Sequence, residues 1–294
     1  MWDQIIHHIT QATQVPFQLR NRRSVGGGCI NQGYCLSDEN QRYFVKLNQA
    51  SQVAMFEAEA LGVQQMWQTK TIRVPQPICW GIAENYAYIV LEWIDMGGRS
   101  QGAAMVEMGR QLAKLHQWKP TDDDPASHQF GWEMNNTIGS TPQINPWTKD
   151  WATFWRDHRI GYQLKLAQRR GARFHQAEQL LDKIPEILAD YHPKPALVHG
   201  DLWGGNASVT AEGEPVIFDP ATYFGDREVD LAMTELFGGF PSAFYQGYQE
   251  VLPLEPGYEQ RKILYNLYHI LNHFNLFGGG YDTQANSMIQ QLLS

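Results

Sequence analysis

The side chains best suited to chemistry follow two short apolar runs in the second half of the chain. His199, Asp201 and Asn206 come after the first run, and Asp219 comes directly after the second. Phosphoryl transfer from ATP needs one carboxylate to accept a hydroxyl proton, and a carboxylate and an amide to hold Mg²⁺ against the phosphates. A His-x-Asp pair, an Asn five residues after the Asp, and a later strand-ending Asp have the spacing of a kinase catalytic loop. The sequence therefore predicts Asp201 as the base and Asn206 and Asp219 as Mg²⁺ ligands.

A glycine-rich segment near the N-terminus is suited to binding phosphate. Gly26, Gly27 and Gly28 lie between two strand-like runs, and glycine lets backbone N–H groups approach a ligand closely. The next alternating run, 42–47, carries Lys46 where kinases place the cation that holds the α and β phosphates of ATP. These residues predict a hairpin that covers the phosphates, followed by a strand that supplies the cation.

A helix predicted over 51–68 supplies a partner for this lysine. Its apolar residues recur at helical spacing, and Glu59 falls on their face of the helix. An unpaired carboxylate would be costly there, so we expect an ion pair between Glu59 and Lys46, with Glu57 as the alternative partner.

Cys29 lies inside the glycine hairpin, close to the expected phosphates. Backbone N–H groups there would favour its thiolate, which predicts a redox-reactive cysteine. The alternative is a small apolar filler. The three cysteines, Cys29, Cys35 and Cys79, form no C-x-x-C motif, which argues against a zinc site or a disulfide framework and fits a reducing compartment.

Composition excludes several classes of function. The 294 residues are 43% hydrophobic, which suffices for a large core or for two lobes. The net charge is −8 and no long basic run occurs, so nucleic-acid binding is disfavoured. No apolar run is long enough to span a bilayer, and the first residues lack the cationic cluster of a signal peptide. We therefore expect no membrane partner and a cytoplasmic protein.

A boundary between two lobes is predicted after Ile94. A buried strand-like run ends there, and Asp95 and two glycines then change the local composition. This divides the chain into an ATP-binding lobe, 1–94, and a catalytic and substrate lobe, 95–294. The adenine edge is expected to meet the backbone of Glu92, Trp93 and Ile94.

The second lobe is expected to be mostly helical. Apolar spacing predicts helices over 100–118, 151–170, 174–192, 226–236 and 258–276, and residues 120–150 read as a long functional loop. Within these helices, His116 and Asp230 are interpreted as structural groups, with Asp230 bonding the backbone of the catalytic loop.

The assembled motifs resemble the fructosamine kinase (ketosamine-3-kinase) family, a branch of the aminoglycoside-phosphotransferase-like kinases. The general kinase residues above indicate only a small-molecule kinase. Three narrower features carry the resemblance, which covers almost the whole chain: HGDLWGGN at 199–206, FGWEMNNTIGSTPQINPW at 130–147 and DWATFWRDHRIGYQL at 150–164. Gly204 stands where the family more often has Ser, and Asp219-Pro220-Ala221 replaces the Asp-Phe-Gly of protein kinases, as is usual in this branch.

The resemblance implies an α+β, bilobal protein-kinase-like fold with a small antiparallel sheet in the N-terminal lobe and a mostly helical C-terminal lobe. It also implies ATP-dependent phosphorylation of the 3-hydroxyl of a ketosamine, free or protein-bound. The 3-phosphate then decomposes and frees the amine, which is a deglycation repair. Candidate substrate contacts are Trp203, Asn135, Asn136, Gln143 and Arg159.

Two alternatives stay open. The first is a kinase of the same fold that acts on an aminoglycoside, choline or homoserine, against which the narrower motifs argue. The second is a catalytically inactive nucleotide-binding protein, against which the complete set of catalytic residues argues.

Overall fold

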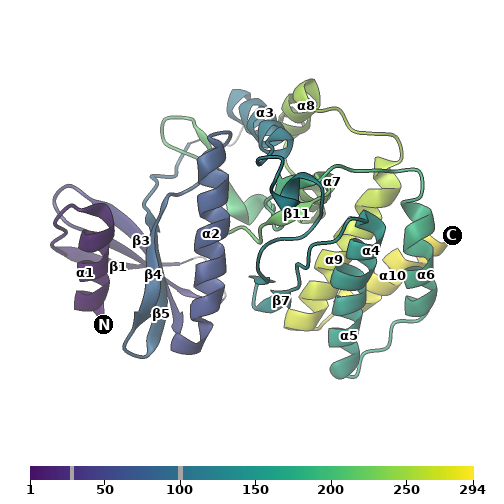
Figure 1. Ribbon diagram of the computed structural model, residues 1–294, viewed down its shortest axis with the longest axis horizontal. Helices are drawn as coiled ribbons and strands as arrows, with labels where there is room; N and C mark the ends of the chain where they lie inside the picture. Colours follow the sequence, from purple (N-terminus) through teal and green to yellow (C-terminus); the bar gives the residue numbers. More distant parts are fainter. Residues whose placement is uncertain (27–29, 99–101) are drawn as a thin grey trace.

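A computed structural model of the chain describes residues 1–26, 30–98 and 102–294 (Figure 1). The part up to Glu92, here called the N-terminal lobe, contains a sheet and two helices, and the part from Ala103, the C-terminal lobe, is mostly helical. Three residues to which the sequence assigns roles lie outside the described residues: Gly27, Gly28 and Cys29.

The N-terminal lobe is a five-stranded antiparallel sheet between two helices. The strands are β1 (Asn21–Val25), β2 (Gln32–Ser37), β3 (Arg42–Gln49), β4 (Pro77–Ala83) and β5 (Tyr86–Glu92), in the spatial order β1-β2-β3-β5-β4. The helix α1 (Trp2–Thr13) covers one face of the sheet, and α2 (Val53–Thr69) covers the other (Figure 1).

The alternation of side chains along β3 directs Lys46 toward α2. Val45 and Leu47 belong to the apolar cluster beneath α1, whereas Phe44 packs in the cluster beneath α2. Successive side chains of a strand point to opposite faces, so Lys46 shares the α2 face with Phe44. The strand therefore presents its only lysine to the helix that carries Glu59.

The helix α2 packs against both lobes. Phe56 contributes to the core beneath the sheet, whereas Val63 and Met66 belong to the large core of the C-terminal lobe. Gly62 lets the helix approach closely, because a Cβ there would lie 2.8 Å from Oγ1 of Thr222. The position of α2 is thus set by apolar contacts on two sides.

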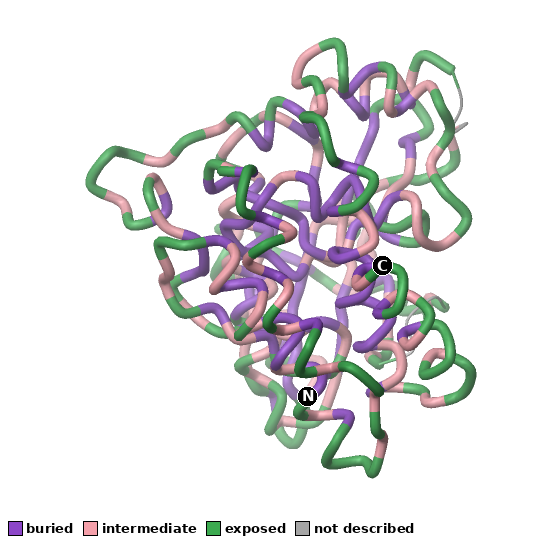
Figure 2. The backbone as a smooth tube through the Cα atoms, turned by 90° about the vertical axis from the view of Figure 1, so that its right-hand side faces the viewer, coloured by how far each residue is buried: buried purple, intermediate pink, exposed green. Residues whose placement is uncertain are grey.

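The C-terminal lobe packs around α9 (Tyr258–Phe277), which is buried along most of its length (Figure 1). Figure 2 shows that buried segments gather in the interior and exposed ones in the outer loops. The other helices are α3 (Ala103–Gln117), α4 (Trp151–Trp155), α5 (Gly161–Arg169), α6 (Ala177–Ile187), α7 (Glu228–Leu236), α8 (Ser242–Val251) and α10 (Tyr281–Leu293). A π-helical turn over Arg156–Ile160 joins α4 to α5. The sequence interpretation missed α8 and α10, and it extended α6 too far at both ends.

Short strand pairs hold the catalytic segments and the expected loop. The pairs are β6 (Asn136–Ile138) with β7 (Thr141–Gln143), β8 (Ala196–Val198) with β11 (Tyr223–Gly225), and β9 (Ala207–Val209) with β10 (Pro215–Ile217). The β6–β7 hairpin lies within the region read as a loop, and its strands run between α2 and α9 (Figure 1).

The connection between the lobes is fastened to the C-terminal lobe. The N–H groups of Gly97 and Gly98 donate to the carbonyl of Val209 at 3.3 and 3.1 Å. A Cβ on Gly98 would lie 2.1 Å from the carbonyl oxygen of Thr210, so this close approach requires glycine. The predicted boundary after Ile94 falls within this connection.

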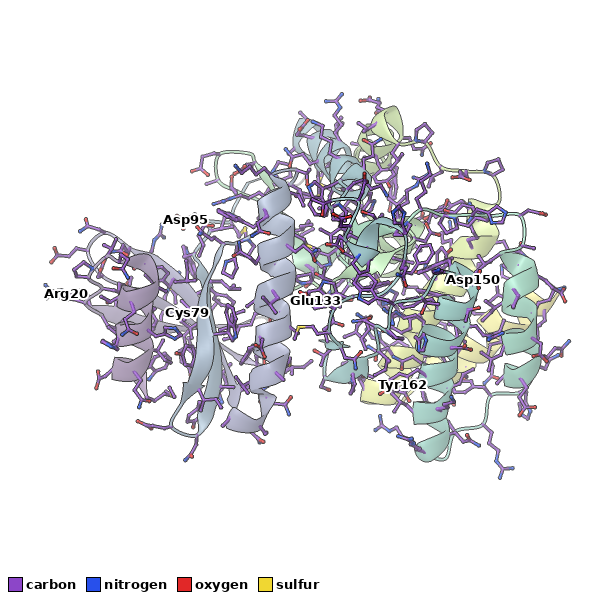
Figure 3. All side chains as sticks on the ribbon, viewed as in Figure 1. Arg20, Cys79, Asp95, Glu133, Asp150 and Tyr162 are labelled. Carbon is purple, nitrogen blue, oxygen red and sulfur yellow. The ribbon has the colours of Figure 1, made fainter. Side chains whose placement is uncertain are left out.

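The two described cysteines are buried in the N-terminal lobe, and Figure 3 labels Cys79 within the sheet. Burial raises the pKa of the Cys79 thiol to about 12, so this cysteine is a packing residue rather than a nucleophile. Within the described ranges, no helix combines the length and the apolar character needed to cross a bilayer.

Candidate active site

The catalytic loop leaves β8 and is closed by hydrogen bonds to the segment that follows β10. Nε2 of His199 donates to the carbonyl of Phe218 at 2.9 Å, because Nδ1 accepts from the N–H of Asp201 at 3.3 Å. The N–H of Ala221 donates to the carbonyl of His199 at 2.8 Å. These bonds place Asp201 and Asp219 on neighbouring segments.

Two residues of this loop pair adopt left-handed backbone conformations. Gly200 has φ +80°, and a Cβ there would lie 2.2 Å from the carbonyl oxygen of Ala221. Asp219 has φ +58°, which is uncommon for a residue other than glycine, although aspartate tolerates it. Strained backbone of this kind is found at functional sites, and here it orients the carboxylate at the end of β10.

Asp230, on α7, holds the catalytic loop by its backbone. It accepts the N–H of His199 at 2.7 Å and the N–H of Gly200 at 2.8 Å, and Nε2 of His116 lies 3.1 Å away. Burial alone would raise the pKa of Asp230, but the hydrogen bond and charge of His116 and the other donors lower it below its usual value. The structural roles predicted for His116 and Asp230 match these contacts.

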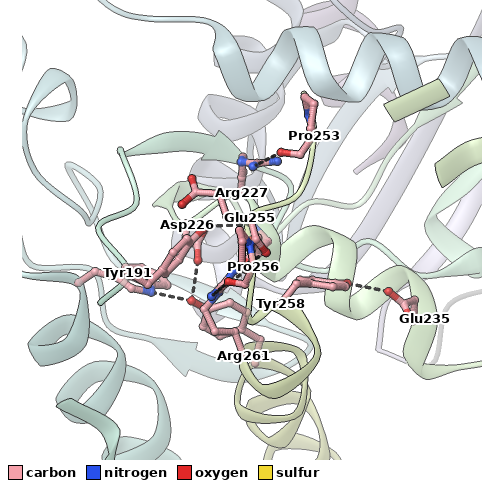
Figure 4. A network of polar contacts seen from close by, with 12 residues as sticks. Tyr191, Asp226, Arg227, Glu235, Pro253, Glu255, Pro256, Tyr258 and Arg261 are labelled. Carbon is pink, nitrogen blue, oxygen red and sulfur yellow. Dashed lines mark hydrogen bonds and ion pairs between the residues drawn. The ribbon is translucent and has the colours of Figure 1, made fainter. Parts of the chain in front are cut away.

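A second buried network anchors the start of α7 (Figure 4). The hydroxyls of Tyr265 and Tyr191 donate to Asp226 at 2.5 and 2.9 Å. Arg261 pairs with Glu228 through bonds of 2.6 and 2.9 Å. Burial and the nearby charge of Glu228 raise the pKa of Asp226 to about 7. Because α7 carries Asp230, which bonds to the backbone of the catalytic loop, this network helps to fix the position of that loop.

Lys46 joins the two lobes at the site. Its Nζ donates to Oε1 of Glu59 at 2.7 Å and to Oδ1 of Asp219 at 2.5 Å. Burial alone would lower the pKa of Lys46, but the carboxylates of Asp219 and Glu59 raise it, so the ammonium stays charged. The contact expected between Lys46 and Glu59 is present, and Glu57 is exposed.

The surroundings of Asp201 favour the protonated form of its carboxyl group. Burial and the neighbouring charge of Asp219 raise its pKa to about 7, although a hydrogen bond from Asn206 opposes the shift. Nδ2 of Asn206 donates to the backbone carbonyl of Asp201 at 2.9 Å and to its carboxylate at 3.3 Å. No donor among the described residues is bonded to Oδ1 of Asn206, so this oxygen is available to a ligand.

A cavity of about 520 Å³ opens between the lobes and brings the predicted catalytic residues together. One end is lined by Lys46, Glu59, Asp201, Asn206 and Asp219. The carboxylate of Asp201, the ammonium of Lys46 and the oxygen-bearing side chains of Asn206 and Asp219 thus face one space, which is the arrangement needed for phosphoryl transfer.

Two of the predicted substrate residues line this cavity, Trp203 and Asn136. The ring of Trp203 packs over Gly205, where a Cβ would lie 2.3 Å from the ring, and the residue is 41% exposed. Nδ2 of Asn136 donates to the carbonyl of Thr222 at 2.7 Å. Asn136 therefore also ties the β6–β7 hairpin to the segment after Asp219.

The other three predicted substrate residues do not line the cavity. Gln143 is buried and bonded to Asn136, to the Ala221 carbonyl and to the Tyr268 hydroxyl. Arg159 is fully buried, donates to the Ile144 carbonyl and stacks on aromatic rings. Asn135 accepts the N–H of Asn145 at 2.8 Å. Hydrogen bonds within the lobe occupy these three side chains and brace the hairpin, and substrate contact by them stays a prediction.

Of the other residues predicted to bind nucleotide, the described ones, Gly26, Glu92, Trp93 and Ile94, do not line this cavity. Gly26 is exposed directly after β1, and the backbone of Glu92, Trp93 and Ile94 lies at the end of β5, outside the cavity. The Glu92 carboxylate pairs with Arg73 and accepts the N–H of Gln76. Its side chain is therefore occupied within the lobe.

The far wall of the cavity was not predicted from the sequence. It contains the rings of Phe237, His273, Phe277 and Tyr281, here called the aromatic wall. The centroid of His273 lies 4.7 Å from Phe237, 5.2 Å from Tyr281 and 5.6 Å from Phe277. The sequence offered little sign of it, because the predicted helix over 258–276 ends one residue before Phe277, which in the structure lies one turn after His273 on α9.

The chain is similar to known kinases of one family over its full length. The sequence model described as fructosamine kinase matches residues 1–294. A probable ketoamine kinase from Synechocystis is 59% identical over 292 residues, which cover 99% of this chain and 97% of the relative. The chloroplastic protein-ribulosamine 3-kinase of Arabidopsis thaliana is 44% identical over 280 residues, which cover 94% of this chain and 83% of the relative.

Solved structures confirm the predicted α+β kinase-like fold. A putative fructosamine-3-kinase from Haemophilus somnus superposes with a TM-score of 0.91 at 29% identity, covering 100% of this chain and 98% of that structure. An aminoglycoside phosphotransferase mutant in complex with AMP-PNP and hygromycin B superposes with a TM-score of 0.62 at 14% identity, over 98% of both chains, and shares the fold alone.

Proposed function

The chain belongs to the fructosamine kinase family, and on this premise we propose that it transfers the γ-phosphoryl group of ATP to the 3-hydroxyl of a ketosamine. A ketosamine is the rearranged adduct of a sugar with an amine. The observation that carries the proposal is the single cavity that joins Asp201 to Lys46, Asn206 and Asp219. Decomposition of the 3-phosphate then frees the amine, so the activity is a deglycation.

Asp201 is the base in this reaction. Its carboxylate accepts the proton of the sugar hydroxyl while the hydroxyl oxygen bonds to the γ-phosphorus, and the bond from this phosphorus to ADP breaks. A carboxylate with a pKa near 7 holds a proton more readily than an ordinary aspartate and is still largely ionised at slightly alkaline pH. Asp230 positions this base through the backbone of His199 and Gly200.

Asn206 and Asp219 fit a Mg²⁺ ion, because both present the oxygen ligands that this cation prefers. Oδ1 of Asn206 is available, and the Asp219 side chain is 42% exposed toward the cavity end that would hold phosphate. When bound, Mg²⁺ neutralises the charge that builds on the phosphates. Lys46 holds the α and β phosphates of ATP, with its direction set by Glu59.

The rest of the nucleotide lies toward the N-terminal lobe. The hairpin that contains Gly26 covers the phosphates, and the backbone of Glu92 to Ile94 meets the adenine edge. On the acceptor side, the partly exposed ring of Trp203 stacks on the sugar, and Asn136 borders the same space.

The test is Mg²⁺-dependent release of ADP with ribulosyl-lysine or fructosyl-lysine as acceptor. Release that these ketosamines stimulate, and that an aminoglycoside or choline does not, supports the proposed reaction and acceptor. Release with choline or an aminoglycoside alone would favour the other kinases of this fold. Absence of release by a protein that binds ATP would favour the inactive nucleotide-binding protein. The Asp201→Asn variant is the control for contaminating kinases.

A further inference from the structure

The cavity has a charged end and an uncharged end. Beyond the catalytic residues, its lining consists of the aromatic wall together with side chains that carry no formal charge: apolar groups such as Ile30 and Leu276, amides, and the hydroxyl of Thr137. Among the described residues of the lining, the only ammonium or guanidinium group is Lys46, and it is bonded to Glu59 and Asp219. Among the residues that the structure describes, the acceptor half therefore presents no free ammonium or guanidinium group to pair with an anionic group.

His273 does not supply that charge. Its Nδ1 lies 2.8 Å from the carbonyl of His269, which takes the proton of this nitrogen. Burial lowers the pKa of His273, so the imidazole is neutral at neutral pH. The proposed function places the Asp201 carboxylate against the sugar hydroxyl, and this carboxylate would repel an anion in the same cavity.

The mouth of the cavity exposes large apolar side chains. Phe277 is 59% exposed, Trp203 41% and Ile30 40%, and all three line the cavity. Ile30 and Leu276 approach each other across Gly139, where a Cβ would lie 3.4 and 3.0 Å from their terminal methyl groups. The apolar rim is therefore continuous from one lobe to the other, and such rims bind apolar parts of ligands.

We propose, on the basis of the proposed ketosamine kinase function, that the amine-derived part of the substrate lies along this rim and that Phe277 determines specificity against a carboxylate close to the ketosamine nitrogen. Adducts of a lysine side chain place four methylene groups next to the nitrogen, and these match the rim. Adducts of the α-amine of a free amino acid place a carboxylate one carbon from the nitrogen, where no basic side chain of the described lining pairs with it.

The first experiment compares two acceptors that differ in charge and hardly in size, the ribulosyl adducts of glycine and of glycinamide. We expect kcat/KM for the glycinamide adduct to exceed that for the glycine adduct by about tenfold or more, because an unpaired carboxylate loses its hydration in the cavity. The adduct of the lysine side chain, with its α-amine acetylated, should be at least as good as the glycinamide adduct. Equal kcat/KM values for the glycine and glycinamide adducts would overturn the inference while the proposed function stands. No turnover of any ketosamine would overturn both.

The second experiment adds a cation at the rim. Phe277→Lys should raise kcat/KM for the glycine adduct relative to the glycinamide adduct severalfold, mainly through KM. Phe277 is exposed at the end of α9, so the substitution leaves the core intact. The matched control is Ile82→Lys, which places the same charge on a 54% exposed residue of β4 that does not line the cavity. An unchanged ratio in Phe277→Lys, or an equal change in the control, would contradict the role of Phe277.

Discussion

The substitution Asp230→Asn tests whether the carboxylate of Asp230 positions the catalytic loop through hydrogen bonds to the loop backbone. Oδ2 of Asp230 accepts the N–H of His199 and Nε2–H of His116, and Oδ1 accepts the N–H of Gly200. An amide of the same shape has one oxygen and one NH₂ group. At least one of these buried donors must then face another donor.

The contacts set the size of the expected effect. A buried N–H group that loses its acceptor costs about 1–3 kcal/mol. We therefore expect the free energy of unfolding to fall by about 1–3 kcal/mol, and kcat to fall because Gly200 directly precedes Asp201. KM for ATP should stay close to wild type, because Asp230 lies outside the cavity.

Urea unfolding and initial-rate kinetics measure these two effects separately. Asp123→Asn, at an exposed position of the loop after α3, removes the same charge and is the matched control. A change in unfolding free energy within about 0.5 kcal/mol of wild type, the usual range for a surface substitution, together with unchanged kcat, would refute the positioning role.

Three further predictions follow from the site. Asp201→Asn should lower kcat by about 10²–10⁴, the usual contribution of a general base, while the dissociation constant for ATP measured by calorimetry stays near wild type; near-normal kcat would count against Asp201. Lys46→Met should raise KM for ATP and lower kcat, and Glu59→Gln should change both values in the same direction by a smaller factor. An unchanged KM for ATP in Lys46→Met would rule out a contact between Lys46 and the phosphates. Folded Asp226 keeps its proton up to about pH 7, whereas the unfolded chain loses it near pH 3.8. The free energy of unfolding of the wild type should therefore fall as the pH rises from about 3.8 to about 7, and it should fall less in Asp226→Asn. Urea titrations with equal pH slopes for both proteins would contradict this.

The catalytic loop could be read from the sequence because its chemistry depends on local spacing. His199, Asp201 and Asn206 fall within eight residues, and Asn206 bonds to the backbone carbonyl of Asp201 within the same loop. The contact of Lys46 with Glu59 was also predictable, because the strand period and the helix period each fix the face on which a side chain lies.

The acceptor side could not be read in this way. The aromatic wall combines the end of α7, the last turns of α9 and the start of α10, and no periodicity places these segments beside Asp201. The contacts of Arg159 and Gln143 could not be read from the sequence either, because they bond to the backbone of a buried hairpin and the segment beside it, which lie far from them along the chain or on another element.

The most direct test of the account is the position of the phosphate in the product. Phosphorus–proton correlation spectra of the reaction with ribulosyl-lysine, recorded before the product decomposes, should link the new phosphate signal to the single proton on C3. That signal should be absent with Asp201→Asn. Phosphate linked to the two protons on C5, or ADP formed with inorganic phosphate alone, would contradict the proposal that Asp201 directs phosphoryl transfer to the 3-hydroxyl of a ketosamine.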